Sequence, residues 1–117
     1  MSSFPSSSLT HASSLVLKCG VSPCLLGFKY LVHAVSLYSF LSSPSLSSVY
    51  RDTASFFSVS LKSVSRDISY ALSRADNIHS LLSSLVGIPI PSYEIRSGFV
   101  ISHLALILRN SSISDIV

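Results

Sequence analysis

The chain has 117 residues, of which 48% are hydrophobic and only 11% are charged, and its net charge is +3. This length suits a single domain with a modest core that needs no metal or disulfide. The low charge counts against a strongly basic nucleic-acid protein, although a small positive charge permits a partner that carries phosphate groups.

The N-terminal residues show no targeting pattern. Residues 1–8 lack the basic start and the apolar stretch of a secretory signal, so we expect a flexible N-terminus and a cytoplasmic protein. Apolar residues at helical spacing predict a first helix over Leu9 to Cys19, with Gly20 in the position of a helix-ending glycine. Ser22-Pro23 predicts the start of a second helix, because proline is favoured in a first turn.

This second helix, expected to reach Phe40 or Leu41, includes the most apolar run of the chain. The run from Leu25 to Leu41 is about one bilayer crossing in length. Four polar side chains recur along it, namely Lys29, His33, Ser36 and Ser39. They indicate a helix with one polar side, so we predict an amphipathic core helix and no membrane partner.

Two further helices are predicted on either side of a tight polar turn. The first covers about Leu46 to Phe57, the second about Leu61 to Ser73, and Ser58 lies in the turn. Ser60 is a good N-cap for the second helix, because its hydroxyl can accept from the unpaired amides of the first turn. This is the layout of a helix-turn-helix.

The second helix of this pair is amphipathic. Its apolar side consists of Val64, Ile68, Ala71 and Leu72 at helical spacing. The opposite side carries small or basic hydrogen-bonding residues, as does the face that a recognition helix lays in a DNA major groove. The candidate DNA-binding residues are Ser60, Lys62, Ser63, Ser65, Arg66 and Ser69. The alternative that these residues form an ordinary solvent-exposed face stays open.

Two more helices complete the prediction. Asp76 or Asn77 is expected to cap a short helix over Ile78 to Val86 that a glycine ends. After an extended Pro-rich stretch, Ser92 is expected to cap a last helix that closes near Arg109. Strand-like apolar runs lack hairpin turn signals between them, so the fold class is all-α, a compact six-helix domain.

The chain offers little for catalysis or metal binding. Cys19 and Cys24 fit neither a redox Cys-x-x-Cys nor a common zinc spacing, so we expect two reduced cysteines packed as small apolar residues. The four histidines fall on separate predicted helices, and no serine lies in a Gly-x-Ser-x-Gly turn. We expect no enzyme activity, no metal and no cofactor.

Three blocks of residues follow one another with the spacing of a known family. The first block contains Gly20-Val21, Gly27-Phe28-Lys29-Tyr30-Leu31 and Ala34-Val35. The second contains Val49-Tyr50, Asp52, Ala54, Phe57, Val64, Arg66, Ile68 and Ala71. The third contains Ser73-Arg74, Asp76-Asn77-Ile78 and Leu82-Ser83-Ser84-Leu85-Val86-Gly87. Together they resemble the C-terminal DNA-binding effector domain of the sporulation-initiation response regulator of spore-forming bacteria.

This resemblance implies an effector domain over residues 9–109, preceded by a flexible segment (1–8) and followed by a loose tail (110–117). It implies a transcriptional regulator module whose helix-turn-helix, through the helix near residues 60–74, reads a short promoter element in double-stranded DNA. Further implied partners are a second copy on tandem sites, RNA polymerase and a homologue that carries a receiver domain.

The recognition helix departs from the family in ways that leave a second function open. Ser63 and Ser69 stand where the family usually has arginine, and Ser65 stands where it has glutamate, whereas Arg66 matches. Each lost arginine removes a potential phosphate contact, and such contacts supply much of the affinity for DNA. The alternative is a degenerate effector domain that binds a partner regulator protein rather than DNA.

Overall fold

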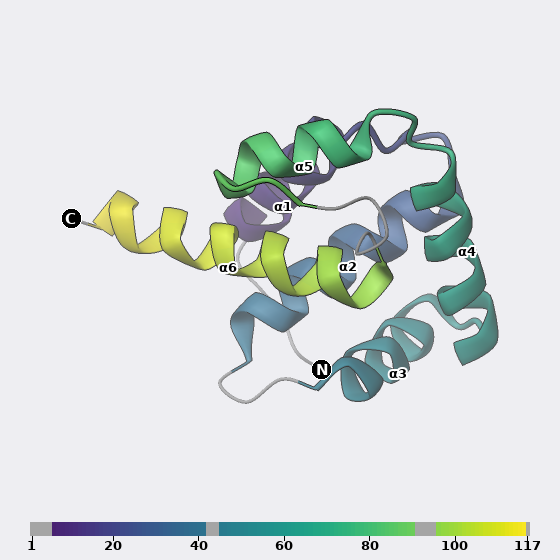
Figure 1. The fold of residues 1–117 in the computed structure, drawn as a ribbon. Helices are drawn as coiled ribbons and strands as arrows, with labels where there is room; N and C mark the ends of the chain where they lie inside the picture. Colours follow the sequence, from purple (N-terminus) through teal and green to yellow (C-terminus); the bar gives the residue numbers. More distant parts are fainter. Residues whose placement is uncertain (1–5, 42–44, 91–95, 117) are drawn as a thin grey trace.

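Six α-helices joined by short connections make up the part of the chain that the structure, a computed structural model, describes: residues 6–41, 45–90 and 96–116 (Figure 1). The helices are α1 (Ser6–Lys18), α2 (Leu26–Phe40), α3 (Leu46–Phe57), α4 (Leu61–Ser73), α5 (Ile78–Val86) and α6 (Ser97–Ile116). These residues contain no strand, so the predicted all-α fold class is confirmed.

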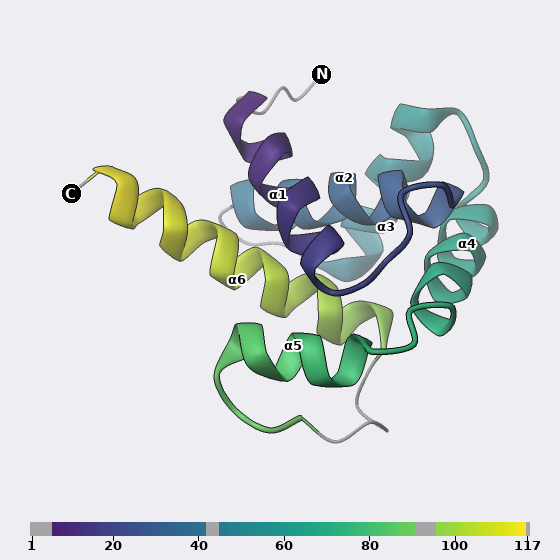
Figure 2. The same ribbon diagram turned by 90° about the horizontal axis from the view of Figure 1, so that it is seen from above.

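Helix α2 is the central element, and α1, α3, α4 and α6 all pack against it (Figures 1 and 2). Every residue from Tyr30 to Leu37 is buried. The prediction of a helix with one polar side was therefore wrong, because His33 and Ser36 lie inside the fold. The cause is tertiary: four neighbouring helices cover the middle of α2, whereas Lys29 near its start and Phe40 at its end are exposed. No pattern within α2 itself could indicate this.

The buried His33 is accommodated by a hydrogen bond across the α2–α3 interface. Its Nδ1 lies 3.1 Å from the hydroxyl oxygen of Thr53, and that hydroxyl donates to the carbonyl oxygen of Val49 at 2.8 Å. Since the single hydroxyl proton of Thr53 is used on Val49, Nδ1 of His33 must carry the proton in its own bond to Thr53. His33 is thus a hydrogen-bonded core residue.

Helix α6 packs against α2, and its apolar residues Val100, Ile101, Leu104 and Leu108 are buried. At the far end of this contact, the guanidinium of Arg109 donates to the carbonyl oxygens of Ser39 and Leu41 at 3.1–3.3 Å. The prediction that this helix closes near Arg109 was wrong, because α6 continues to Ile116, beyond the other helices (Figure 1). Its predicted cap Ser92 lies outside the described residues.

The other helix ends can be compared with the bounds that capping residues, glycine and proline predicted. The bounds of α3, α4 and α5 agree with the prediction, and Gly20 and Gly87 have positive φ angles of 87° and 89°, as helix-ending glycines often do. The start of α2 does not agree, because Pro23 lies in a turn before the helix. Asn77 occupies the N-cap position of α5, but its side chain makes no capping hydrogen bond.

Cysteine burial and helix length bear on two more expectations. Cys19 is buried as expected, whereas Cys24 is exposed in the turn before α2, so the expectation of two buried cysteines was half wrong. Over the ranges that the structure describes, no helix combines the length and the apolar character needed to span a bilayer.

Candidate nucleic-acid interface

The turn between α3 and α4 is built by Ser58, which adopts a left-handed backbone conformation with φ of 57°. The N–H of Ser58 donates to the Ser55 carbonyl at 3.2 Å, and the N–H of Val59 donates to the Ala54 carbonyl at 3.0 Å. This pair of bonds is a Schellman motif, which satisfies carbonyls at the end of α3 and reverses the chain. Val59 then packs against the core.

Helix α4 begins with the predicted cap. The hydroxyl oxygen of Ser60 accepts from the N–H of Ser63 at 3.0 Å and donates to the hydroxyl of Ser63 at 2.9 Å. The prediction of Ser60 as N-cap is confirmed. Because the Ser60 hydroxyl already makes both of these bonds, its structural role in the cap accounts for this serine without any ligand.

One side of α4 is packed tightly against α2. Val64, Ile68 and Ala71 are fully buried, as the periodicity predicted. The two helices approach most closely at Gly27, where an added Cβ would lie 2.7 Å from Cβ of Ala71 and would overlap the carbonyl oxygen of Asp67. This close crossing fixes how α4 is rotated about its axis, and therefore which of its side chains face outward.

The outward side carries the candidate residues. Lys62, Ser65, Arg66 and Ser69 are exposed, and Ser63 is half-buried. Arg66 makes an ion pair with Asp67, with Nε and Oδ1 3.4 Å apart and with the two side chains 68% and 19% exposed. A pair this exposed contributes at most about 1 kcal/mol, so the guanidinium can exchange this partner for a phosphate.

A cleft beside this face contains residues that sequence reasoning missed. It has a volume of about 510 Å³, and Ser65 and Ser69 line it together with Tyr50 from α3 and Arg96 and Ser97 at the start of α6. The hydroxyls of Ser69 and Ser97 lie 3.4 Å apart. Arg96 precedes α6 and is some thirty positions from Ser65, so no local pattern could assign it to this face.

Basic residues gather on this part of the chain. Of the eight lysines and arginines, five lie on α3, on α4, or directly after α4 or before α6. They are Arg51, Lys62, Arg66, Arg74 and Arg96, all of them exposed. The modest net charge is thus unevenly distributed along the chain, and α3, α4 and their flanks take most of the positive charge.

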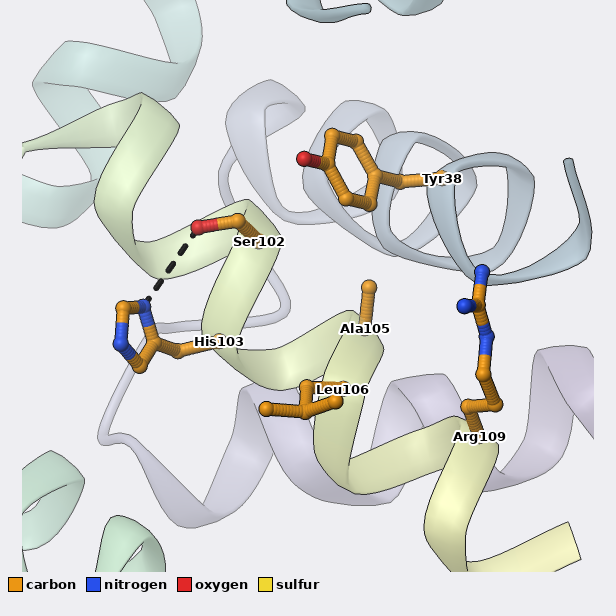
Figure 3. Close-up of a pocket in the computed structure, with 6 residues that line it drawn as sticks. All are labelled: Tyr38, Ser102, His103, Ala105, Leu106 and Arg109. Carbon is orange, nitrogen blue, oxygen red and sulfur yellow. Dashed lines mark hydrogen bonds between the residues drawn. The ribbon is translucent and has the colours of Figure 1, made fainter. Parts of the chain in front are cut away.

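A second cleft, about 380 Å³ in volume, lies between α2 and α6 and contains a serine–histidine pair (Figure 3). The Ser102 hydroxyl and His103 Nδ1 are 3.4 Å apart, but Nδ1 is also 2.9 Å from the carbonyl oxygen of Phe99. A carbonyl only accepts, so Nδ1 carries the proton and cannot act as a base toward Ser102. The Ser102 hydroxyl donates to the same carbonyl at 3.1 Å.

Comparison with known proteins adds no relative. No protein-family model matches the chain, and neither a curated protein nor a solved structure does. The likeness to the sporulation effector domain therefore rests on the three blocks of residues alone, and the function is argued from the geometry of α3 and α4.

Proposed function

We propose that α3 and α4 form a helix-turn-helix and that the chain is a sequence-specific DNA-binding module of a transcriptional regulator, of the sporulation-initiation effector type. The observation that carries this proposal is the outward side of α4, where Lys62, Ser65, Arg66 and Ser69 are exposed. In a major groove, such a helix reads base edges while its flanks contact the phosphates.

The connection between the two helices supports the proposal. Only Ser58, Val59 and Ser60 separate α3 from α4, and each has a defined role as left-handed turn residue, core contact or cap. A short connection of this kind is what a helix-turn-helix needs, because the first helix must brace the second at a fixed angle.

Roles for the basic residues follow from their positions and chemistry. Lys62 and Arg66 contact phosphates or guanine edges, since both reach outward from the first half of α4. Ser65 and Ser69 make shorter hydrogen bonds to phosphate or base edges. Arg96, at the edge of the same cleft, adds a phosphate contact from α6. Double-stranded promoter DNA is the partner of this function, and a second copy on tandem sites and either RNA polymerase or a receiver-containing homologue are the further partners that we propose.

The decisive experiment measures binding to a duplex with tandem sporulation-type promoter boxes and to a scrambled duplex, by fluorescence anisotropy across a salt series. Three phosphate contacts predict a slope of log K against log salt of roughly −3. Arg66→Ala should weaken binding several-fold and make the slope shallower by about 1. Lys18→Ala, which removes an exposed cation from the end of α1, is the matched control and should change neither.

Equal and negligible binding to both duplexes would contradict the proposal and favour the second candidate, a domain that binds a partner regulator protein. Two observations favour that candidate: Leu61 and Tyr70 on α4 are about half-exposed, and Asp67 offsets one of the two positive charges of this helix. Co-elution with a purified receiver-containing homologue, lost in Tyr70→Ser, would support it.

A further inference from the structure

A cavity of about 300 Å³ lies at the junction of α1, α2 and α3, on residues that the DNA-binding proposal does not use. Phe28, Val32 and His33 from α2 and Phe56 and Phe57 from α3 line most of it, and Lys29 is its charged residue. Val32 and His33 are buried and form the bottom, whereas Phe56 is 54% exposed at the opening. Aromatic and aliphatic side chains around a few polar groups are typical of small-molecule sites.

Three rings form a continuous aromatic wall in this cavity. The ring centroids of Phe56 and His33 are 4.5 Å apart, those of Phe56 and Phe57 are 4.9 Å apart, and those of His33 and Phe57 are 5.5 Å apart. The hydrogen bond to Thr53 holds His33 in place. Because the rings support one another, an aromatic surface is held ready before any ligand arrives, which lowers the entropic cost of binding.

Lys29 is the charged side chain that lines the cavity, and the carboxylate of Asp52 on α3 acts electrostatically on His33 in its wall. The ammonium of Lys29 lies 5.2 Å from the centroid of Phe57 and 5.8 Å from that of Tyr30. Arg66–Asp67 is the sole ion pair formed within the described residues, so Lys29 has no carboxylate partner there. An anionic group on a ligand would supply that partner while the rest of the ligand covers the aromatic wall.

We propose that this cavity binds a small amphipathic anion, with an aromatic or apolar body of up to three rings and a single carboxylate or sulfonate group. The volume sets the size, because about 300 Å³ is at the lower end for small-molecule sites. Phe56 covers the body of the ligand, and Lys29 pairs with its anionic group. This site is separate from the outward side of α4 and does not depend on DNA binding.

The test uses two fluorescent probes that share one aromatic body. The anion is 8-anilinonaphthalene-1-sulfonate, and N-phenyl-1-naphthylamine is its counterpart without the sulfonate. We expect one molecule of the anion per folded chain, and weaker binding of the neutral probe. Phe56→Ala should weaken the anion about fivefold or more, because the ring covers the ligand body. Lys29→Met should weaken the anion about two- to fivefold and leave the neutral probe unchanged.

Matched controls separate this site from nonspecific apolar binding. Phe40, at the end of α2, is 55% exposed, close to the 54% of Phe56, but it does not line the cavity, so Phe40→Ala should leave binding unchanged. Lys18→Met is the control for loss of charge. Equal losses in Phe40→Ala and Phe56→Ala, or a Lys29→Met effect that is the same for both probes, would overturn the proposal. Circular dichroism confirms that each variant is folded.

Discussion

Ser58 holds a backbone conformation that serine adopts at a cost. A left-handed residue with a Cβ is less stable than a right-handed one by roughly 1–2 kcal/mol, and glycine avoids this penalty. The protein is therefore less stable with serine at this position, in the turn between α3 and α4, than it would be with glycine. The conformation is held because two backbone bonds and the packing of Val59 determine it from both sides.

This cost predicts that Ser58→Gly raises the free energy of unfolding by about 0.5–1 kcal/mol, after the extra entropy of glycine in the unfolded chain is subtracted. Ser55→Gly is the matched control, because Ser55 is likewise an exposed serine but has ordinary helical geometry in α3. It should lower the free energy of unfolding by about 0.5–1 kcal/mol. Urea denaturation measures both free energies of unfolding. A decrease in both variants would exclude the left-handed conformation of Ser58.

His33 makes stability depend on pH. Burial lowers the pKa of this imidazole below its usual value near 6.5, and the charge of Asp52 opposes the shift only in part. Below about pH 6.5 the imidazole binds a proton in the unfolded chain but not yet in the folded chain. The free energy of unfolding therefore decreases as the pH is lowered. Above that pH this contribution is fully present.

Denaturation curves at about pH 7.5 and pH 5.5 test this dependence. The wild type should be less stable at the lower pH, and His33→Gln should show a smaller difference between the two conditions. His79→Gln, at an exposed position on α5, should keep the wild-type difference. An unchanged pH dependence in His33→Gln would assign the effect to other groups.

Among the elements, the crossing of α2 over α4 is the contact that most directly positions the candidate interface. Gly27 permits it, since backbone and a Cβ of α4 occupy the space that a side chain would need. Gly98 occupies the corresponding place in α6, as the second residue of its helix, but an added Cβ there meets only the flexible end of Leu46.

The two glycines therefore predict opposite costs for one substitution. Alanine is favoured over glycine in a helix by about 1 kcal/mol, but forced overpacking costs about 1–3 kcal/mol. We expect Gly27→Ala to lower the melting temperature by several degrees and Gly98→Ala to leave it nearly unchanged or higher. A Gly27→Ala protein as stable as wild type would show that α2 and α4 can separate.

The elements also show which signals the sequence carries. The bounds of α3, α4 and α5 follow from nearby residues, such as the cap Ser60 and the glycine after Val86, and these bounds were predictable. The burial of His33 and the place of Arg96 beside α4 were not, because each depends on a helix that is distant in sequence. The outward side of α4 was predictable for the same reason as its bounds: apolar residues recur within the helix itself.

For the molecule as a whole, the two cysteines report on global opening. Cys24 is exposed, whereas Cys19 is buried in the core, where burial raises the pKa of its thiol to about 11. A thiol reagent near pH 8 should therefore modify Cys24 at once. Cys19 should react only when the chain unfolds, at a rate lower by a factor of about a thousand or more. Cys24→Ser isolates the slow reaction, and mass spectrometry counts the modified thiols.

The same thiol limits stability at high pH. From about pH 9 toward 11, the unfolded chain loses the Cys19 proton while the folded chain retains it, so stability declines across that range.

In the labelling experiment, rapid modification of Cys19 in the folded protein near pH 8 would mean that the region around α1 opens locally rather than with the whole molecule.

The radius of gyration, 13.2 Å, agrees with the value of about 13 Å expected for a folded domain of this length. Helix α2 nevertheless depends on α6 for a large part of its cover, and Arg109 closes the end of α2 from more than sixty residues away. A ribosome makes α2 long before it makes α6. This central, apolar helix must therefore wait until α6 has been made, exposed to chaperones or to other nascent chains, before it can be enclosed.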